Sequence, residues 1–140
     1  MTYGSETWSV IKSEKERLAV AERAMERRML RISLRDHITN DKIRNETKVA
    51  DVNEECWRNK LRWAGHVARI RDNRWTKKIY QWYPRDIKRP PGRHPMRWAD
   101  EIREVEGPLW QRLAANRERW KRKVGRLHLS RQYVADSGIK

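Results

Sequence analysis

The chain of 140 residues contains no phenylalanine and one cysteine, Cys56. A single cysteine excludes a disulfide framework, and it excludes zinc fingers and knuckles, which need at least two cysteines. It is consistent with a reducing compartment. The sequence also lacks a run of about 18 apolar residues, so we predict no membrane-spanning segment.

The residue types that catalytic and metal sites require are present but scattered. Seven aspartates occur and no two are adjacent, whereas phosphoryl transfer needs clustered carboxylates that hold two Mg²⁺ ions. The four histidines show no metal-ligand spacing, and we interpret His66 as a packed or capping residue. Glu54 and Glu55 precede Cys56, where their charge disfavours a reactive thiolate. We therefore predict no catalytic residue, metal site or cofactor.

Tryptophan and positive charge are abundant instead. The chain has eight tryptophans, and its 34 lysines and arginines against 19 acidic residues give a formal net charge of +15. Residues 58–78 hold eight basic residues and one acid, and residues 117–126 hold six and one. A solvated helix surface usually mixes both signs, so these runs predict contact with a polyanion. Such binding is driven by phosphate neutralisation and weakens steeply with salt.

Apolar residues recur at helical spacing along the chain, and no alternating run predicts a strand. We predict an all-α fold of about four main helices in two small lobes. Helices are expected over about 14–32, 39–48, 52–70 and 75–82, and again on both sides of Gly107-Pro108. The predicted parts are a helical region over 1–83, a basic Pro/Gly-rich linker over 84–95, a C-terminal helical hairpin over 96–125 and a frayed tail over 126–140.

Local signals refine two of these helices. Ser13 with Glu16 forms a capping-box pattern before the first helix, and Asp51 with Glu54 forms another before the third. Gly65 lies inside the third helix at a cost of about 1 kcal/mol against alanine, which indicates close packing or close approach of nucleic acid. The apolar face of the first helix is predicted to consist of Leu18, Ala21, Met25, Met29 and Ile32.

Seven of the eight tryptophans divide into two predicted groups. One group lies on apolar helix faces and is expected to pack in the core: Trp63, Trp98, Trp110 and Trp120. The other group lies near element ends beside basic residues: Trp8, Trp75 and Trp82. For this second group, stacking on bases and packing beneath arginines both stay open.

The loop from Lys88 to Pro95 also allows two interpretations. Its Pro-Gly-Arg sequence is similar to short peptides that insert an arginine, here Arg93, into a minor groove. Such a hook needs Arg-Gly-Arg, and Pro91 occupies the first position. A plain basic linker is therefore the favoured interpretation.

Five segments form a series along the chain. They are Tyr3-Gly4-Ser5-Glu6-Thr7-Trp8, Glu26-Arg27-Arg28-Met29-Leu30-Arg31-Ile32, Leu61-Arg62-Trp63-Ala64-Gly65-His66-Val67, Pro91-Gly92-Arg93 with Arg97-Trp98-Ala99-Asp100-Glu101-Ile102, and the spaced set Trp110, Ala114, Arg117, Trp120. In content and order the series resembles the C-terminal region of non-LTR (LINE-type) retrotransposon reverse transcriptases. That family has Gly-Arg-Pro in the fourth segment, whereas His94 interrupts the pattern here.

The resemblance covers about residues 1–125 and implies the thumb and post-thumb region of an endonuclease–reverse transcriptase, with residues 1–83 as the thumb-like part. In such enzymes the thumb holds the template–primer duplex, and the C-terminal part helps to bind element RNA or target DNA. The chain starts inside the first segment, so we expect it to lack the endonuclease, fingers and palm. A truncated copy or gene-model fragment is the expected origin, with Met1 as an internal methionine of a longer reading frame.

We expect non-catalytic binding of RNA and/or DNA, with no membrane or small-molecule partner and with a nuclear or nucleocytoplasmic location. The parent RNA-directed DNA polymerase would use Mg²⁺, but the isolated chain is expected to be inactive. The alternatives are a free-standing basic helical nucleic-acid-binding protein and a tryptophan-anchored protein–protein module. The predicted phosphate contacts are Arg27, Arg28, Arg31, Arg58, Lys60, Arg62, Lys77, Lys78, Arg89, Arg93 and Arg97.

Overall fold

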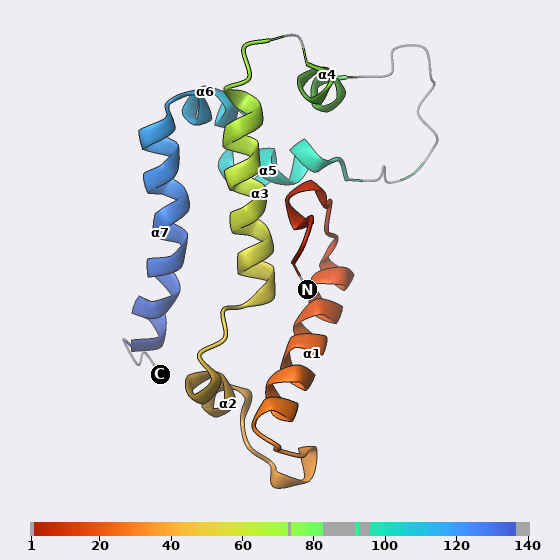
Figure 1. The fold of residues 1–140 in the computed structure, drawn as a ribbon, viewed down its shortest axis with the longest axis vertical. Helices are drawn as coiled ribbons and strands as arrows, with labels where there is room; N and C mark the ends of the chain where they lie inside the picture. The colour runs from red at the N-terminus through yellow and green to blue at the C-terminus, as the bar shows by residue number, and fades with distance from the viewer. Residues whose placement is uncertain (1, 73, 83–91, 93–95, 137–140) are drawn as a thin grey trace.

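The computed structural model describes residues 2–72, 74–82, 92 and 96–136, and the side chains of these except 81 and 127–136. Within these ranges the regular structure is entirely helical, with seven α-helices, two short 3-10 helices and no strand. The all-α prediction is confirmed. Helices were expected over six segments, and the seventh arises because the segment after Gly107-Pro108 is broken at Asn116 into two helices (Figure 1).

The first α-helix, α1 (Lys12–Met29), follows the 3-10 helix η1 (Ser5–Thr7). It begins two residues earlier than predicted, because the N–H of Ile11 donates to Glu14 Oε2 at 3.0 Å. Glu14 therefore closes the first turn in place of the Ser13–Glu16 pair. The helix ends before Arg31, which adopts the left-handed conformation at φ 56°. The chain then passes through η2 (Leu34–Asp36).

The next two helices are α2 (Asn40–Thr47) and α3 (Val52–Ala68). Lys48 at φ 52° ends α2. The predicted cap of α3 is confirmed, since Asp51 Oδ1 accepts from the N–H groups of Asn53 and Glu54 at 3.0 and 3.1 Å. A carboxylate at this position also suits the positive end of the helix dipole.

Four further helices complete the chain: α4 (Trp75–Gln81), α5 (Trp98–Glu106), α6 (Trp110–Ala115) and α7 (Arg117–Asp136). Gly107 at φ 85° ends α5, where a side chain would be strained. The predicted linker over 84–95 lies outside the described residues except for Gly92. α7 continues to Asp136, past the residue at which a frayed tail was predicted.

α3 is the central helix of the molecule (Figure 1). α7 runs antiparallel along one side of it, α1 lies on the other side, and α5 and α6 pack near its C-terminal half. The buried cluster joins Leu61 and Ala64 of α3 to residues of the last three helices: Ile102, Trp110, Ala114, Trp120 and Val124. Residues on both sides of the predicted linker therefore share one core.

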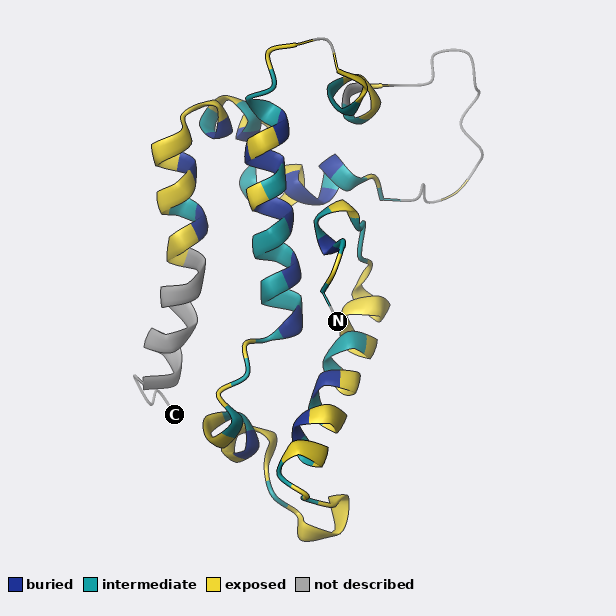
Figure 2. Cartoon of the chain, viewed as in Figure 1, coloured by how far each residue is buried: buried dark blue, intermediate teal, exposed yellow. Residues whose placement is uncertain are grey.

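The side of α1 that faces the rest of the molecule contains its buried positions (Figure 2), and the buried residues of this helix are acidic. Glu22 and Glu26 are buried, whereas Met25 and Met29 are 48 % and 62 % exposed. The predicted apolar face of α1 is therefore wrong at its centre. The reason lies in α2, because Arg44 Nη2 is 2.9 Å from Glu22 and 3.5 Å from Glu26, and its Nη1 is 3.2 Å from Asp51.

Candidate nucleic-acid interface

Three of the four tryptophans predicted for the core belong to it. Trp110 and Trp120 are buried in the cluster, and Trp98 packs against it. Their rings meet at centroid distances of 6.4 Å for Trp98–Trp110 and 6.3 Å for Trp110–Trp120. The fourth prediction is wrong, because Trp63 lies outside this cluster and stacks on the exposed His66 at 5.3 Å.

Gly65 allows α7 to pack directly on α3. A Cβ added at Gly65 would lie 2.5 Å from both Cδ1 and Nε1 of Trp120. That indole is fixed, since its Nε1 donates to the backbone oxygen of Leu61 at 2.8 Å. Of the two explanations considered for this glycine, close packing is the one that the structure supports.

Lys60 is part of the protein interior. It is 3 % exposed, forms an ion pair with Glu101 of α5, and donates to the backbone oxygen of Trp8 at 3.0 Å. Burial, only partly opposed by Glu101, lowers the pKa of Lys60. A phosphate cannot reach an ammonium in this position, so the prediction of Lys60 as a phosphate contact is corrected. The buried Lys60 ammonium therefore joins α3 both to Glu101 and to the backbone of Trp8.

Two predicted arginines are also engaged by the protein itself. Arg27 donates to Asn40 Oδ1 at 2.8 Å and to the backbone oxygen of Ile38 at 3.3 Å, which joins the end of α1 to the start of α2. Arg58 pairs with Glu54 and Glu55 on its own helix. The two carboxylates offset the charge of Arg58, whereas Arg27 keeps its charge but donates to neutral oxygens within the protein.

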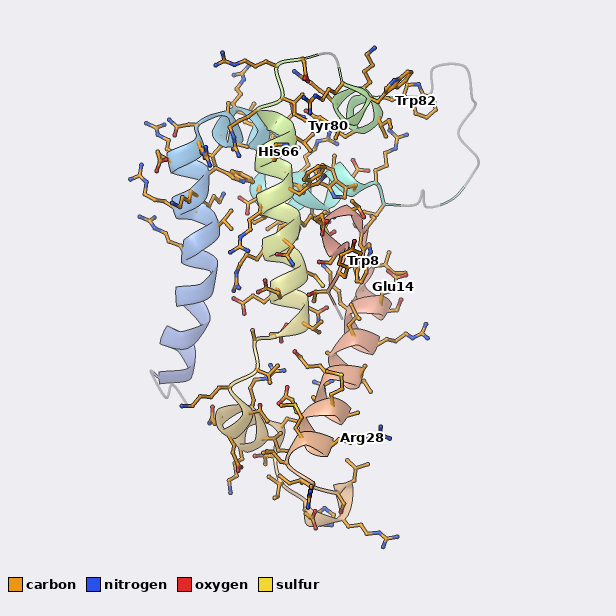
Figure 3. The ribbon with its side chains drawn as sticks, viewed as in Figure 1. Trp8, Glu14, Arg28, His66, Tyr80 and Trp82 are labelled. Atoms are coloured by element: carbon orange, nitrogen blue, oxygen red, sulfur yellow. The ribbon has the colours of Figure 1, made fainter. Side chains whose placement is uncertain are left out.

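The other predicted contacts do not converge on one place. Arg28 and Arg31 are exposed near the C-terminal end of α1. This end of α1 and α4 lie at opposite ends of the molecule (Figure 3). Arg62 is exposed on α3, Lys78 is exposed on α4, and Arg97 is the exposed N-cap of α5. Lys77 donates to the backbone oxygen of Ile70 at 3.1 Å. Arg89 and Arg93 lie outside the described residues.

A further group of exposed cations lies on α6 and α7. Only Trp120 and Val124 are buried along the described part of α7, and both face α3. In Figure 3 the nitrogen-tipped side chains of upper α7 extend away from the body of the molecule. We call this group the α7 cationic surface, and its exposed members are Arg112, Arg117, Arg119, Lys121, Arg122 and Arg126.

The α7 cationic surface continues onto α3 at the end where α7 begins. Arg69, the C-cap of α3, donates to the backbone oxygen of Ala114 at 2.8 Å. Burial, followed by the positive charge of Arg117, lowers the pKa of Arg69. Arg62 precedes Arg69 by two helical turns and shares its face of α3. The guanidinium groups of Arg69 and Arg117 repel each other, and a bound anion would relieve this repulsion.

Most residues of this surface were not among the predicted contacts. The sequence did carry a signal, because the run 117–126 has six basic residues against one acid. What it did not show is which cations stay in solvent. Lys123, for example, lies in the same run but pairs with Glu106 of α5.

The described residues contain no group of three or more histidine, cysteine or acidic side chains placed to hold a metal ion. None of the helices in the described part of the chain is long and apolar enough to cross a membrane.

The chain is similar to an uncharacterized transposon-derived protein of Caenorhabditis elegans. The two are 37 % identical over a 133-residue alignment that covers 86 % of this chain. The alignment covers 48 % of the relative, so the chain spans about half the length of the curated protein that it matches. No protein-family model matches the chain. No solved structure matches it either. The similarity supports a transposon origin.

Proposed function

We propose that the chain is the thumb and post-thumb part of a non-LTR retrotransposon reverse transcriptase, and that it binds RNA and/or DNA without catalysing a reaction. The ordered series of segments between Tyr3 and Trp120 carries the resemblance to that family. A transposon-derived relative of about twice the matched length agrees with a chain that forms one part of a larger element protein.

The observation that carries this proposal is the α7 cationic surface. Its six exposed cations lie in residues 109–126, where the sequence has one acid, Glu118, and Arg62 and Arg69 of α3 are adjacent to them. Side chains on such a surface contact phosphate oxygens, which position a nucleic acid without reading its bases. The interface therefore favours binding by charge and shape, with weak dependence on base sequence.

Fixed geometry adds to the charge. The Trp120 hydrogen bond to Leu61 and the Arg69 bond to Ala114 hold α7 and α6 against α3. The cations thus project from a rigid helix pair, so fewer degrees of freedom are lost on binding than from a flexible tail. Arg28 and Arg31 form a separate exposed group at the far end of α1. They would meet the same ligand only if it extended along the molecule.

The chemistry of polymerisation lies outside this proposal. The parent enzyme's two-metal chemistry needs clustered carboxylates, and the described residues bring no such group together. We expect the isolated chain to incorporate no nucleotide, and we expect it to act in the nucleus or nucleocytoplasm, where element RNA and target DNA meet.

The experiment is a salt titration of binding to an RNA–DNA hybrid duplex. Arg119, Arg122 and Arg126 on the α7 cationic surface are replaced together by glutamine. If they contact phosphates, the slope of log affinity against log salt falls by about two to three, since each contact contributes about 0.7–0.9. The affinity of this variant for the hybrid duplex at low salt should also be lower than that of the parent chain.

The matched control is the triple variant Lys12→Gln, Arg17→Gln and Arg35→Gln. It removes the same net charge from exposed positions of α1 and η2. The slope should stay close to that of the parent chain. An equal loss in both triple variants would assign binding to net charge alone and would contradict the proposed interface.

A further inference from the structure

A second surface, on α4, exposes apolar rather than charged side chains. Trp75, Ile79 and Trp82 are 75 %, 69 % and 66 % exposed. Trp75 and Ile79 belong to α4 and Trp82 is its C-cap residue, and their spacing of i, i+4 and i+7 places them on one side of the helix. Two tryptophans in water on one short helix are unusual, since indole is among the largest apolar groups that a folded protein buries. We call these three residues the α4 platform.

The opposite side of α4 is fixed to the core. The Tyr80 ring lies 6.3 Å from the rings of both Trp98 and Trp110. Lys77 Nζ donates to the backbone oxygen of Ile70 at 3.1 Å, which ties α4 to the end of α3. The platform is therefore presented outward by a helix that is packed on its other side (Figure 3).

The charge around the α4 platform indicates its ligand. Lys78 Nζ lies 5.1 Å from the centroid of Trp75, over the ring. Arg71 and Arg74 are exposed in the segment just before the helix. Asp72, the one acid in residues 69–82, pairs with Arg74. Indole rings interleaved with cations suit a ligand that has both flat rings and negative charge.

From these observations we propose that the α4 platform binds unpaired nucleotides, with bases stacked on Trp75 and Trp82 and phosphates near Lys78 and Arg74. This inference rests on the proposed nucleic-acid binding and adds a single-strand site to it. A duplex cannot use the platform along its length, because its base faces are already covered by neighbouring bases. The two indoles are roughly 10 Å apart along the helix, so each would hold a separate base.

The position of α4 also suits this role. It lies at the end of the molecule where α3 ends and α6 begins, which is the same end as the start of the α7 cationic surface (Figure 1). One nucleic acid with a paired and an unpaired part can therefore contact both surfaces. An acidic protein segment would satisfy the cations, but it would not use the flat faces of two indoles in the same way.

The test compares two probes on the full 140-residue chain: a single-stranded oligothymidine and a blunt, loop-free duplex of two complementary strands with the same number of phosphates. The double variant Trp75→Ala and Trp82→Ala should bind oligothymidine at least about tenfold more weakly, because each stacked base contributes strongly to affinity. Its affinity for the duplex should stay within about twofold. The variant Trp75→Tyr and Trp82→Tyr keeps the aromatic faces and should recover most of the oligothymidine affinity.

The control variant is Val105→Ala with Leu109→Ala, at two side chains 61 % and 60 % exposed elsewhere. It should change neither affinity. Equal weakening of both probes by the alanine variant, or no weakening of oligothymidine, would overturn the single-strand site while leaving duplex binding intact. The single-strand site would also be overturned if the parent chain self-associates, the alanine variant is monomeric, and the two bind oligothymidine equally well. If the parent chain binds neither probe, the proposed function itself fails.

Discussion

Gly65 decides how closely α3 and α7 approach each other. Without a Cβ at this position, the buried indole of Trp120 lies directly against the α3 backbone. The ring cannot move aside without losing the 2.8 Å bond from its Nε1 to Leu61. A single hydrogen atom in place of a methyl group thus sets the packing on which the α7 cationic surface rests.

We predict that Gly65→Ala lowers the free energy of unfolding by about 1–2 kcal/mol, measured by urea denaturation. The cost of overpacking exceeds the gain of about 1 kcal/mol in helix propensity. Gly125→Ala is the matched control, because it lies in α7 and a Cβ there meets no atom within 4 Å. It should gain about 0.5–1 kcal/mol. A neutral Gly65→Ala would show that Trp120 is free to shift.

At the scale of elements, charged side chains rather than apolar ones join α1 to its neighbours. Burial raises the pKa of Glu22, although the N–H of Val52 and the guanidinium of Arg44 oppose that rise. The Val52 N–H donates to Glu22 Oε1 at 2.8 Å, and the Arg44 pairs complete the junction of α1, α2 and α3. Helical periodicity cannot predict this arrangement, because it ranks Met25 and Met29 above glutamate for burial.

Glu101 links three elements at once. It pairs with Lys60 of α3 and, at 2.6 Å, with Lys15 of α1, and it extends from α5. Both Lys60 and Glu101 are buried. Removing one partner of a buried ion pair leaves an uncompensated charge, which is costly. This carboxylate is therefore a main link between the N-terminal helices and α5.

We predict that Glu101→Gln lowers the free energy of unfolding by about 3 kcal/mol at neutral pH, and that the deficit shrinks as the pH rises. Without Glu101 the already lowered pKa of Lys60 falls further below its ordinary 10.5. Between that lowered pKa and 10.5 the unfolded chain binds more protons than the folded one, so stability increases with pH.

Urea denaturation at several pH values between neutral and about 10 would measure this effect. Glu104→Gln, at an exposed position of the same helix, serves as the control and should change stability by no more than about 0.5 kcal/mol at any pH. A Glu101→Gln deficit that does not change with pH would exclude Lys60 as the group responsible.

At the scale of the whole molecule, one cluster connects segments from both sides of residues 84–95. Ile102 of α5 is fully buried together with Leu61 and Ala64 of α3. Such a shared core couples the unfolding of the helices that contribute to it. Both the α7 cationic surface and the α4 platform depend on this core for their positions.

We predict that Ile102→Ala destabilises α3 and α6 together, by about 2–5 kcal/mol. Native-state hydrogen exchange should show the same loss of protection for slowly exchanging amides of both helices. Val105→Ala, on the exposed side of α5, should change protection by no more than about 0.5 kcal/mol. Loss of protection in α6 alone would indicate two independently folding lobes.

The sequence by itself determined the helical class, the cap at Asp51 and the core positions of Trp110 and Trp120, because these follow from local periodicity and capping chemistry. Charge counts likewise indicated a polyanion partner. Which cations remain available was not a local property. Lys60 is neutralised by Glu101, which lies 41 residues away along the chain, and Arg27 is held by Ile38 and by Asn40 at the start of α2.

Only the tertiary structure decided which faces meet solvent. It buried the glutamates of α1, because Arg44 lies opposite them, and it left Trp75 and Trp82 outside, because α4 packs against the core through Tyr80 on another side. Helical spacing defines the faces of a helix but does not say which face is covered. That choice depends on partners that lie far away in sequence, and it is made when α3 gathers the other helices around it.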